Sequence, residues 1–275
     1  MTVLAVGLAL LGSLFFALGA ALQQHEAAGA ERPTIGRLFR RPRWLLGGLS
    51  IGVGTGLHVL ALRYGPLTVV QPMGVASLLF ALPCAAALGG RRPTSRELSA
   101  AAVIAVGLGG LVLVVPQGTG DPHLSTTGVV ALLAGAAITA LALWAASRLT
   151  SPAGRAGLLA MAAGVLYGAT ATLTRVLVYG DWDLWLVLAV PLPCLVALVL
   201  LQHAYAAGHF GVAFAALQVA DPLTAVVFGA LLLGEPLPTG AVSTLTALAA
   251  ACLTAAGTVA LARTTPLSPN VRLDR

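Results

Sequence analysis

Nine apolar runs, each 18 to 25 residues long, constrain the fold of this chain more than any other feature. A helix needs about 20 mostly apolar residues to cross the hydrocarbon core of a bilayer. Only helices and closed barrels satisfy every backbone polar group in lipid, and these runs are too long and too evenly apolar for barrel strands. We therefore predict an all-α polytopic membrane protein. Its nine transmembrane helices are expected at 2–23, 44–62, 67–88, 98–116, 125–147, 156–178, 184–201, 209–233 and 240–262.

The composition argues against a soluble protein. Hydrophobic residues make up 58% of the 275 residues and charged residues 9%, whereas a soluble domain carries about 25% charged residues. With a mean hydropathy of +0.94, a soluble all-α fold is the weaker alternative. The first run, 2–23, is the other candidate for a different role, a cleaved signal peptide. It lacks a basic leading region and exceeds the usual length of a signal core, so a retained helix is favoured.

All fifteen basic residues are arginines, and thirteen of them share one side when the nine runs are threaded in order. Five lie in the loop 25–43, whereas the loop 116–125 on the opposite side has none. Arginine-rich loops stay in the cytoplasm, which predicts a cell-membrane protein with its N-terminus outside and a cytoplasmic tail at 263–275. The bilayer, through its anionic headgroups, is the partner of these charges. A nucleic-acid partner is excluded, because no basic stripe with interleaved aromatic residues occurs.

The sequence also indicates an internal repeat within this single membrane domain. Segment 61–94 aligns without a gap with segment 204–237: each has a polar residue with a proline inside an apolar run and ends on a charged residue before a proline. The copies lie five spans apart, an odd number, so the second is inverted in the membrane. Inverted repeats are a common plan of secondary transporters. The predicted parts are repeat 1 (2–116, four helices), a linking helix (125–147) and repeat 2 (156–262, four helices).

Polar residues beside a proline mark one candidate pocket wall in each repeat. The pairs are Gln71 with Pro72, and Gln218 with Pro222. A proline leaves the carbonyl four residues earlier without its helical partner. Such interruptions are tolerated at membrane depth where the backbone lines a cavity or is buried in protein. We expect all four residues to line a substrate pathway, with simple kinks as the alternative.

Asp221 is the acid placed deepest in a predicted span, 12 residues from each end of 209–233. A charge at the bilayer centre costs at least about 2.5–3.5 kcal/mol, so such a residue is a functional-site hypothesis by default. Burial favours the neutral form of a carboxyl group. We therefore predict that Asp221 binds a coupling proton or cation, and we name it as a tentative metal ligand; a purely structural hydrogen bond is the alternative. No other cofactor is expected.

Two further sets of residues complete the candidates. His58 and Arg175 lie near the outer ends of their spans and are expected along the substrate pathway, with an interfacial role as the alternative. Gly48, Gly52 and Gly56 recur every four residues and predict a flat stripe for close helix packing. No catalytic motif of the GxSxG, HExxH or phosphate-loop type is present, so we do not expect an enzyme.

The segment 44–83, together with the ending "VVFGALLLGEPL" (226–237), resembles a known family. It is similar to the NIPA-like branch of the drug/metabolite transporter (EamA-like) superfamily. The matching positions are Ala61, Pro66, Val70, Pro72, Gly74, Ser77 and Glu235. The resemblance implies a secondary transporter of the cytoplasmic membrane; NIPA-like members are associated with magnesium, and others export metabolites, amino acids or drugs.

Together these features predict a transporter that works by alternating access around a midplane cavity between the repeats. Its substrate is expected to be a small metabolite or a cation. Magnesium is one candidate substrate, because one carboxylate with waters can hold it. A small molecule transported together with a proton is another. The alternatives are a non-transporting membrane scaffold or subunit and a lipid flippase. Formation of a homodimer also stays open.

Overall fold

The computed structural model describes residues 2–30, 34–61, 63–64, 73–89, 92–114, 123–179, 184–234 and 240–264. Within these ranges all regular structure is helical, and eight helical segments are long and apolar enough to cross a membrane. The chain is therefore a multi-pass membrane protein. The segments are α1 (Thr2–Ala28), α3 (Pro42–Ala61), α6 (Ser95–Val114), α7 (Thr126–Ser147), α8 (Pro152–Tyr179), α9 (Leu184–Ala189) with α10 (Pro191–Ala206), α11 (Phe210–Leu232) and α12 (Ala241–Thr264).

Two shorter helices complete the described fold, α2 (Ile35–Leu38) and α5 (Ser77–Leu88). Helix α5 forms the second part of the span predicted at 67–88, of which residues 67–72 lie outside the described part of the chain. Helix α1 runs five residues past its predicted end at 23 and α2 follows it, so the predicted loop 25–43 is partly helical. This extension reflects the two alanines, Ala27 and Ala28, because alanine is the strongest helix former.

Helix α8 lies at the centre of the packing. It contacts α7, α10 and α11, and it is the most buried of the spanning helices. The surrounding helices instead expose large apolar side chains, such as Ile138 (68% exposed), Leu192 (68%) and Leu245 (65%). Outward-facing residues of this kind are suited to lipid rather than water.

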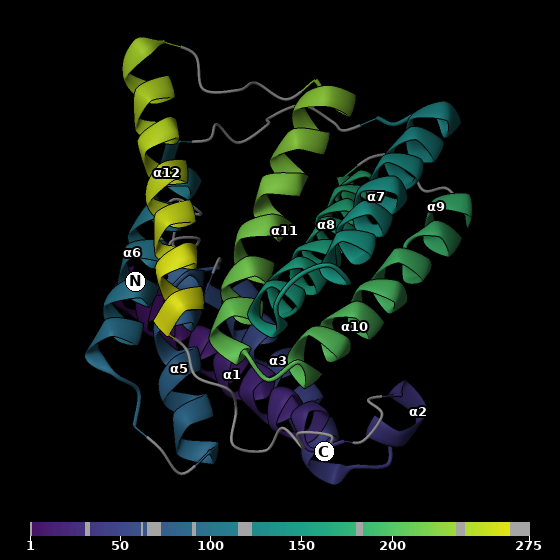
Figure 1. Cartoon of the computed structure of the whole chain (residues 1–275). Coiled ribbons are helices and arrows are strands. Elements are labelled where there is room, and N and C mark those ends of the chain that lie inside the picture. The colour runs from purple at the N-terminus through teal and green to yellow at the C-terminus, as the bar shows by residue number, and fades with distance from the viewer. Residues whose placement is uncertain are drawn as a thin grey trace.

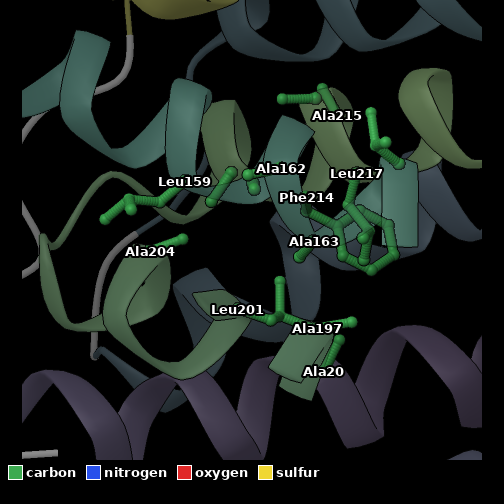
Figure 2. Packing of buried hydrophobic residues seen from close by; sticks show 14 of the residues in the cluster. Ala20, Leu159, Ala162, Ala163, Ala197, Leu201, Ala204, Phe214, Ala215 and Leu217 are labelled. Atoms are coloured by element: carbon green, nitrogen blue, oxygen red, sulfur yellow. The ribbon is translucent and has the colours of Figure 1, made fainter. Parts of the chain in front are cut away.

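The core where α8, α10 and α11 meet consists mainly of small residues. Figure 2 shows Ala162, Ala163, Ala197 and Ala204 facing one another there, all fully buried, with Phe214 filling the space beside them. Because lipid tails are as apolar as leucine, membrane helices associate through close packing rather than a hydrophobic driving force. Alanine at these positions lets the helix backbones approach.

The helices pair in a regular pattern. Helix α1 packs against α3 and α5, while α8 packs against α10 and α11. Helices α6 and α12 lie side by side (Figure 1), and α5 contacts α11. A contact between α1 and α10 also joins the two groups.

Gly48, Gly52 and Gly56, which were predicted to form a packing stripe, do not pack closely against any described helix. A Cβ atom added at Gly52 or Gly56 would meet nothing within 4 Å, and one at Gly48 would meet only the side-chain nitrogen of Gln23 at 3.7 Å. The four-residue spacing identified a flat helix face correctly, but that face is not the one against which another described helix packs.

Helices α1 and α3 instead meet through glycines on a neighbouring face of α3. Gly12 lies opposite Gly54, and Gly19 lies opposite Gly47. A Cβ on Gly54 would lie 2.6 Å from the carbonyl oxygen of Gly12, and a Cβ on Gly19 would lie 2.5 Å from that of Gly47. These distances leave no room for a side chain, so the two backbones are in contact.

The two predicted interruptions behave differently. Helix α11 continues through Pro222 without a break, so the expected opening of that helix is wrong. Near the other predicted interruption, a turn at Val75 and Ala76 precedes α5, and the chain there is not a continuous helix. Gln71 and Pro72 lie outside the described residues.

Candidate functional site

A pocket of about 270 Å³ lies between α1, α3, α11 and the start of α5. Ser13 and Gln218, which line it, are close to the middle of their helices, whereas His58 and Val59 lie near the C-terminal end of α3. The described lining residues come from four segments of the chain. They are Gly12, Ser13, Phe16, Gly54, Thr55, His58, Val59, Gly74, Ser77 and Gln218.

A hydrogen bond crosses the pocket wall between α11 and α5. The amide Nε2 of Gln218 donates to Oγ of Ser77 at 2.9 Å. Ser77 is the first residue of α5, directly after the turn, and Gln218 lies one turn before Pro222. The two partners belong to the two different predicted repeats.

A second polar contact ties α1 to the chain before α5. The Ser13 hydroxyl lies 2.8 Å from the carbonyl oxygen of Met73 and 2.9 Å from that of Ala9, and it can donate to either. The Thr55 hydroxyl donates to the carbonyl of Ile51 at 3.0 Å. Both hydroxyls therefore point their proton at the backbone, which leaves oxygen lone pairs as acceptors for a solute.

The imidazole of His58 lies against Gly74. A Cβ on Gly74 would be 3.2 Å from Cε1 of His58, so the glycine leaves room for the ring. His58 is half-buried and lines the pocket. One pocket thus contains both His58 and Gln218, which the sequence predicted along a substrate pathway.

Asp221 is not among the described residues that line the pocket. It lies one turn further along α11, where the helix meets α8. Gly164 and Gly168 let the backbones touch, because a Cβ on Gly168 would lie 2.5 Å from the carbonyl oxygen of Asp221. Tyr167 of α8 is close enough to Asp221 to interact electrostatically. The acid therefore sits beside the pocket, at the interface of two helices.

An aromatic chain leads away from the pocket floor. Phe16 lines the pocket and lies 6.2 Å from Phe214, ring centre to ring centre. Phe214 lies 5.5 Å from Phe210, and Phe210 lies 5.6 Å from Tyr205. Phe214 and Tyr205 are 1% exposed. This buried chain fills the space between the pocket and the side of the protein where α1 ends.

A buried polar network lies further along on the same side. The Trp44 indole N–H donates to Oε1 of Gln202 at 2.9 Å, and Nε2 of Gln202 donates to Oε1 of Gln23 at 3.4 Å. All three side chains are at most 4% exposed. An ion pair of 3.0 Å between Arg41 and Glu26 also joins α1 to the start of α3. The network links α1, α3 and α10 at one end of the bundle.

The sequence did not single out several of these residues. Ser13, Thr55 and Ser77 resemble ordinary hydroxyl residues of apolar helices, and no motif distinguishes them. Gln23 and Gln202 do carry a signal, because each places an amide at the end of a long apolar run.

Besides Asp221, two further predicted pathway residues lie outside the described pocket lining. Pro222 is in α11 beside Asp221, and Arg175 is half-buried near the C-terminal end of α8. Among the described residues, no group of three or more His, Cys, Asp or Glu side chains is arranged to hold a metal ion.

Comparison with known proteins gives a similarity to a bacterial protein. An uncharacterized protein of Corynebacterium glutamicum is 28% identical to this chain over 203 residues, which are 70% of each protein. No family model and no solved structure match the chain. The function must therefore be argued from the pocket itself.

Proposed function

We propose that this protein is a secondary transporter that moves a small polar solute across the cell membrane by alternating access. The observation that carries the proposal is the pocket between the helices, with polar side chains contributed by helices from both halves of the chain. A solute held between Ser13 of α1 and Gln218 of α11 would contact both halves of the chain at the same time. Movement of one half against the other would then expose it to either side.

The helix pairing supports two inverted repeats. The contacts of α1 with α3 and α5 have counterparts in those of α8 with α10 and α11. The contact of α5 with α11 and that of α6 with α12 would lie on the axis that relates the two halves. In this arrangement α7 is the linking helix, and the segment 67–88 is the ninth span.

The interface of α6 and α12 supports the same symmetry in more detail. A Cβ on Gly107 would meet the carbonyl of Ala250 and the side chain of Thr254. A Cβ on Gly257 would meet the carbonyl of Ala100 and the side chain of Ile104. Gly107, Ala250 and Thr254 correspond to Gly257, Ala100 and Ile104, and the residue numbers of each pair differ by 150. A two-fold axis between the helices would produce this reciprocal contact.

The aromatic chain and the network of Trp44, Gln202 and Gln23 support a state that is closed on the side where α1 ends. The arginine distribution assigns that side to the cytoplasm. We therefore infer an N-terminus outside, a C-terminus inside and a pocket closed toward the cytoplasm. Drug/metabolite transporters, which segment 44–83 resembles, are expected to work in this way.

A lipid flippase is the second candidate. Val59, which borders the pocket, is 60% exposed on the outer surface of α3, and a flippase needs such a lateral approach from lipid. Transfer of a fluorescent phospholipid between leaflets of reconstituted vesicles would favour this candidate over the transporter.

Labelling of a single introduced cysteine tests the transporter. Cys84, Cys194 and Cys252 are replaced by alanine, and Ser13→Cys is made in that background. A small membrane-impermeant thiol reagent is then added to either face of sealed, oriented vesicles. Alternating access predicts reaction from both faces. Ala17→Cys, one turn along α1 and fully buried, is the matched control and should react from neither. Reaction of Ser13→Cys from one face alone, or from none, would contradict the proposal.

A further inference from the structure

The charge of the pocket lining restricts the chemistry of the solute. Five polar side chains line it, namely Ser13, Thr55, His58, Ser77 and Gln218. No Asp, Glu or Arg side chain is among the described lining residues, and the chain contains no lysine. The nearest described acid along the lining helices is Asp221, which meets α8 instead.

The hydrogen-bond directions show what the lining offers to a solute. The oxygens of Ser13 and Thr55 are acceptors, since their protons go to backbone carbonyls. The Gln218 amide gives one N–H to Ser77. Its second N–H and its carbonyl oxygen have no hydrogen bond within the described part of the chain. The pocket therefore presents donors and acceptors together, a pattern that matches amides and alcohols.

The volume limits the size of the solute. At about 30 Å³ per water molecule in the liquid, a pocket of about 270 Å³ has room for about nine waters. It is slightly smaller than the usual range for small-molecule sites, which begins at about 300 Å³. A solute of up to about nine non-hydrogen atoms fits.

Apart from the titratable His58, the described lining residues offer a charged solute no opposite charge in exchange for its lost hydration. Removal of an ion from water is costly unless a partner ion and hydrogen bonds replace the water. Magnesium in particular is held by carboxylates and retained waters, and the described lining has no carboxylate. A neutral polar solute loses far less hydration, and the amide and hydroxyl groups replace its hydrogen bonds.

We propose that the pocket selects a short uncharged solute that both donates and accepts hydrogen bonds, of the primary amide or polyol class, and rejects anions and divalent cations. This inference rests on the proposed transport function and specifies its substrate class. Gln218 is the residue that sets the selectivity, since its amide both donates and accepts at the pocket wall.

The proposed rejection of charged solutes, here called the charge rule, is tested with three probes of similar length. Malonamide is neutral, malonate is an anion and 1,3-diaminopropane is a dication at neutral pH. Each is applied as an iso-osmolar gradient to proteoliposomes, and entry is followed as swelling by light scattering, with protein-free liposomes as the reference. The wild-type protein should admit malonamide at least tenfold faster than either charged probe. Thermal stabilisation of the purified protein by each probe, and by Mg²⁺, should follow the same order.

Two variants test the role of Gln218 and its partner. Gln218→Glu keeps the shape but adds a carboxylate, so it should lower malonamide entry and raise diaminopropane entry. Ser77→Ala removes the partner of the amide and should slow malonamide by about tenfold, the usual effect of one lost hydrogen bond. Ser99→Ala is the matched control, because Ser99 is exposed, lies outside the described pocket lining and donates to the Arg96 carbonyl. It should behave as wild type.

The outcomes separate the inference from the function on which it rests. Faster entry of malonate or diaminopropane than of malonamide would overturn the charge rule but leave a transporter. Stabilisation by Mg²⁺ but not by malonamide would likewise overturn it in favour of the ion. A third outcome is that Ser13→Cys labels from both faces but no probe enters or stabilises the protein. This outcome would overturn the inference on the solute and leave the proposed transport function standing. The same result with labelling from one face would overturn both.

Discussion

Substitution of Gly54 by alanine tests the contact on which the pocket wall depends. Gly54 lines the pocket and also touches α1. A Cβ there would lie 2.6 Å from the carbonyl oxygen of Gly12 and 2.9 Å from the backbone nitrogen of Phe16. Both atoms belong to backbone, so no flexible side chain can move aside. Gly52, two residues earlier in the same helix, offers the matched control, since its Cβ would meet nothing within 4 Å.

The two substitutions share one effect and differ in another. Alanine is more favourable than glycine inside a helix by roughly 0.5–1 kcal/mol, and both variants gain this. Only Gly54→Ala forces α1 and α3 apart, and overpacking of this kind typically costs about 1–3 kcal/mol. Gly52→Ala should therefore be as stable as wild type or slightly more stable. Gly54→Ala should be less stable than Gly52→Ala by about 1–3 kcal/mol.

Thermal unfolding in detergent, followed by tryptophan fluorescence and checked by size-exclusion chromatography, measures this difference. Gly54→Ala should also slow solute entry, because α1 and α3 both line the pocket. Equal stability of the two variants would show that α1 and α3 do not touch at Gly54, and the pocket wall described above would be wrong. Destabilisation by Gly52→Ala that depends on protein concentration would instead identify the exposed glycine stripe as a contact between two copies of the chain.

Three other predictions address the acid, the buried network and the orientation. Asp221→Asn should fold and insert normally but lose the pH or cation dependence of solute uptake; uptake at the wild-type rate with the same pH dependence would make the acid structural. Gln202→Leu leaves the indole N–H of Trp44 buried without an acceptor, which costs about 1–3 kcal/mol of stability. It should also increase labelling of Ser13→Cys from the cytoplasmic face. Reduced stability with unchanged labelling would show that this network does not close the pocket toward the cytoplasm. A cytoplasm-dependent reporter fused after residue 275 should be active, and Arg40→Cys should label from inside only; labelling from outside would reverse the topology.

The places of the eight spanning helices in the described part of the chain could be predicted because they depend on a local quantity, the length of an apolar run. The predicted spans 44–62, 125–147 and 209–233 coincide with α3, α7 and α11 to within three residues at each end. Departures occur where a run ends in alanine, as at α1, and where turn residues divide a span, as before α5. In both places local helix propensity, rather than hydropathy, decides the boundary.

The pocket residues depend on how each helix is rotated, which the sequence does not state. Gly48 and Gly47 are neighbours in sequence, yet only Gly47 faces α1 closely. A four-residue period shows which side chains share a face but not which helix covers that face. Ser13 and Thr55 were missed for the same reason. Gln218 was found because an amide beside an acid and a proline is unusual in a membrane helix, whatever its rotation.

The placement of Gln218 and Asp221 on α11 suggests how a solute and an ion would be coupled. The amide of Gln218 bonds to α5 in the pocket, while the backbone at Asp221 touches α8. A proton or cation bound at Asp221 would therefore act first on the packing of α8 against α11, and on the solute only through movement of α11. Because the proposed solute is uncharged, the coupling ion would carry all the charge of the cycle. Each elementary charge that crosses 100 mV supplies about 2.3 kcal/mol, equivalent to a solute gradient of about fifty-fold. The membrane potential, and not only the pH gradient, would then drive such a transporter.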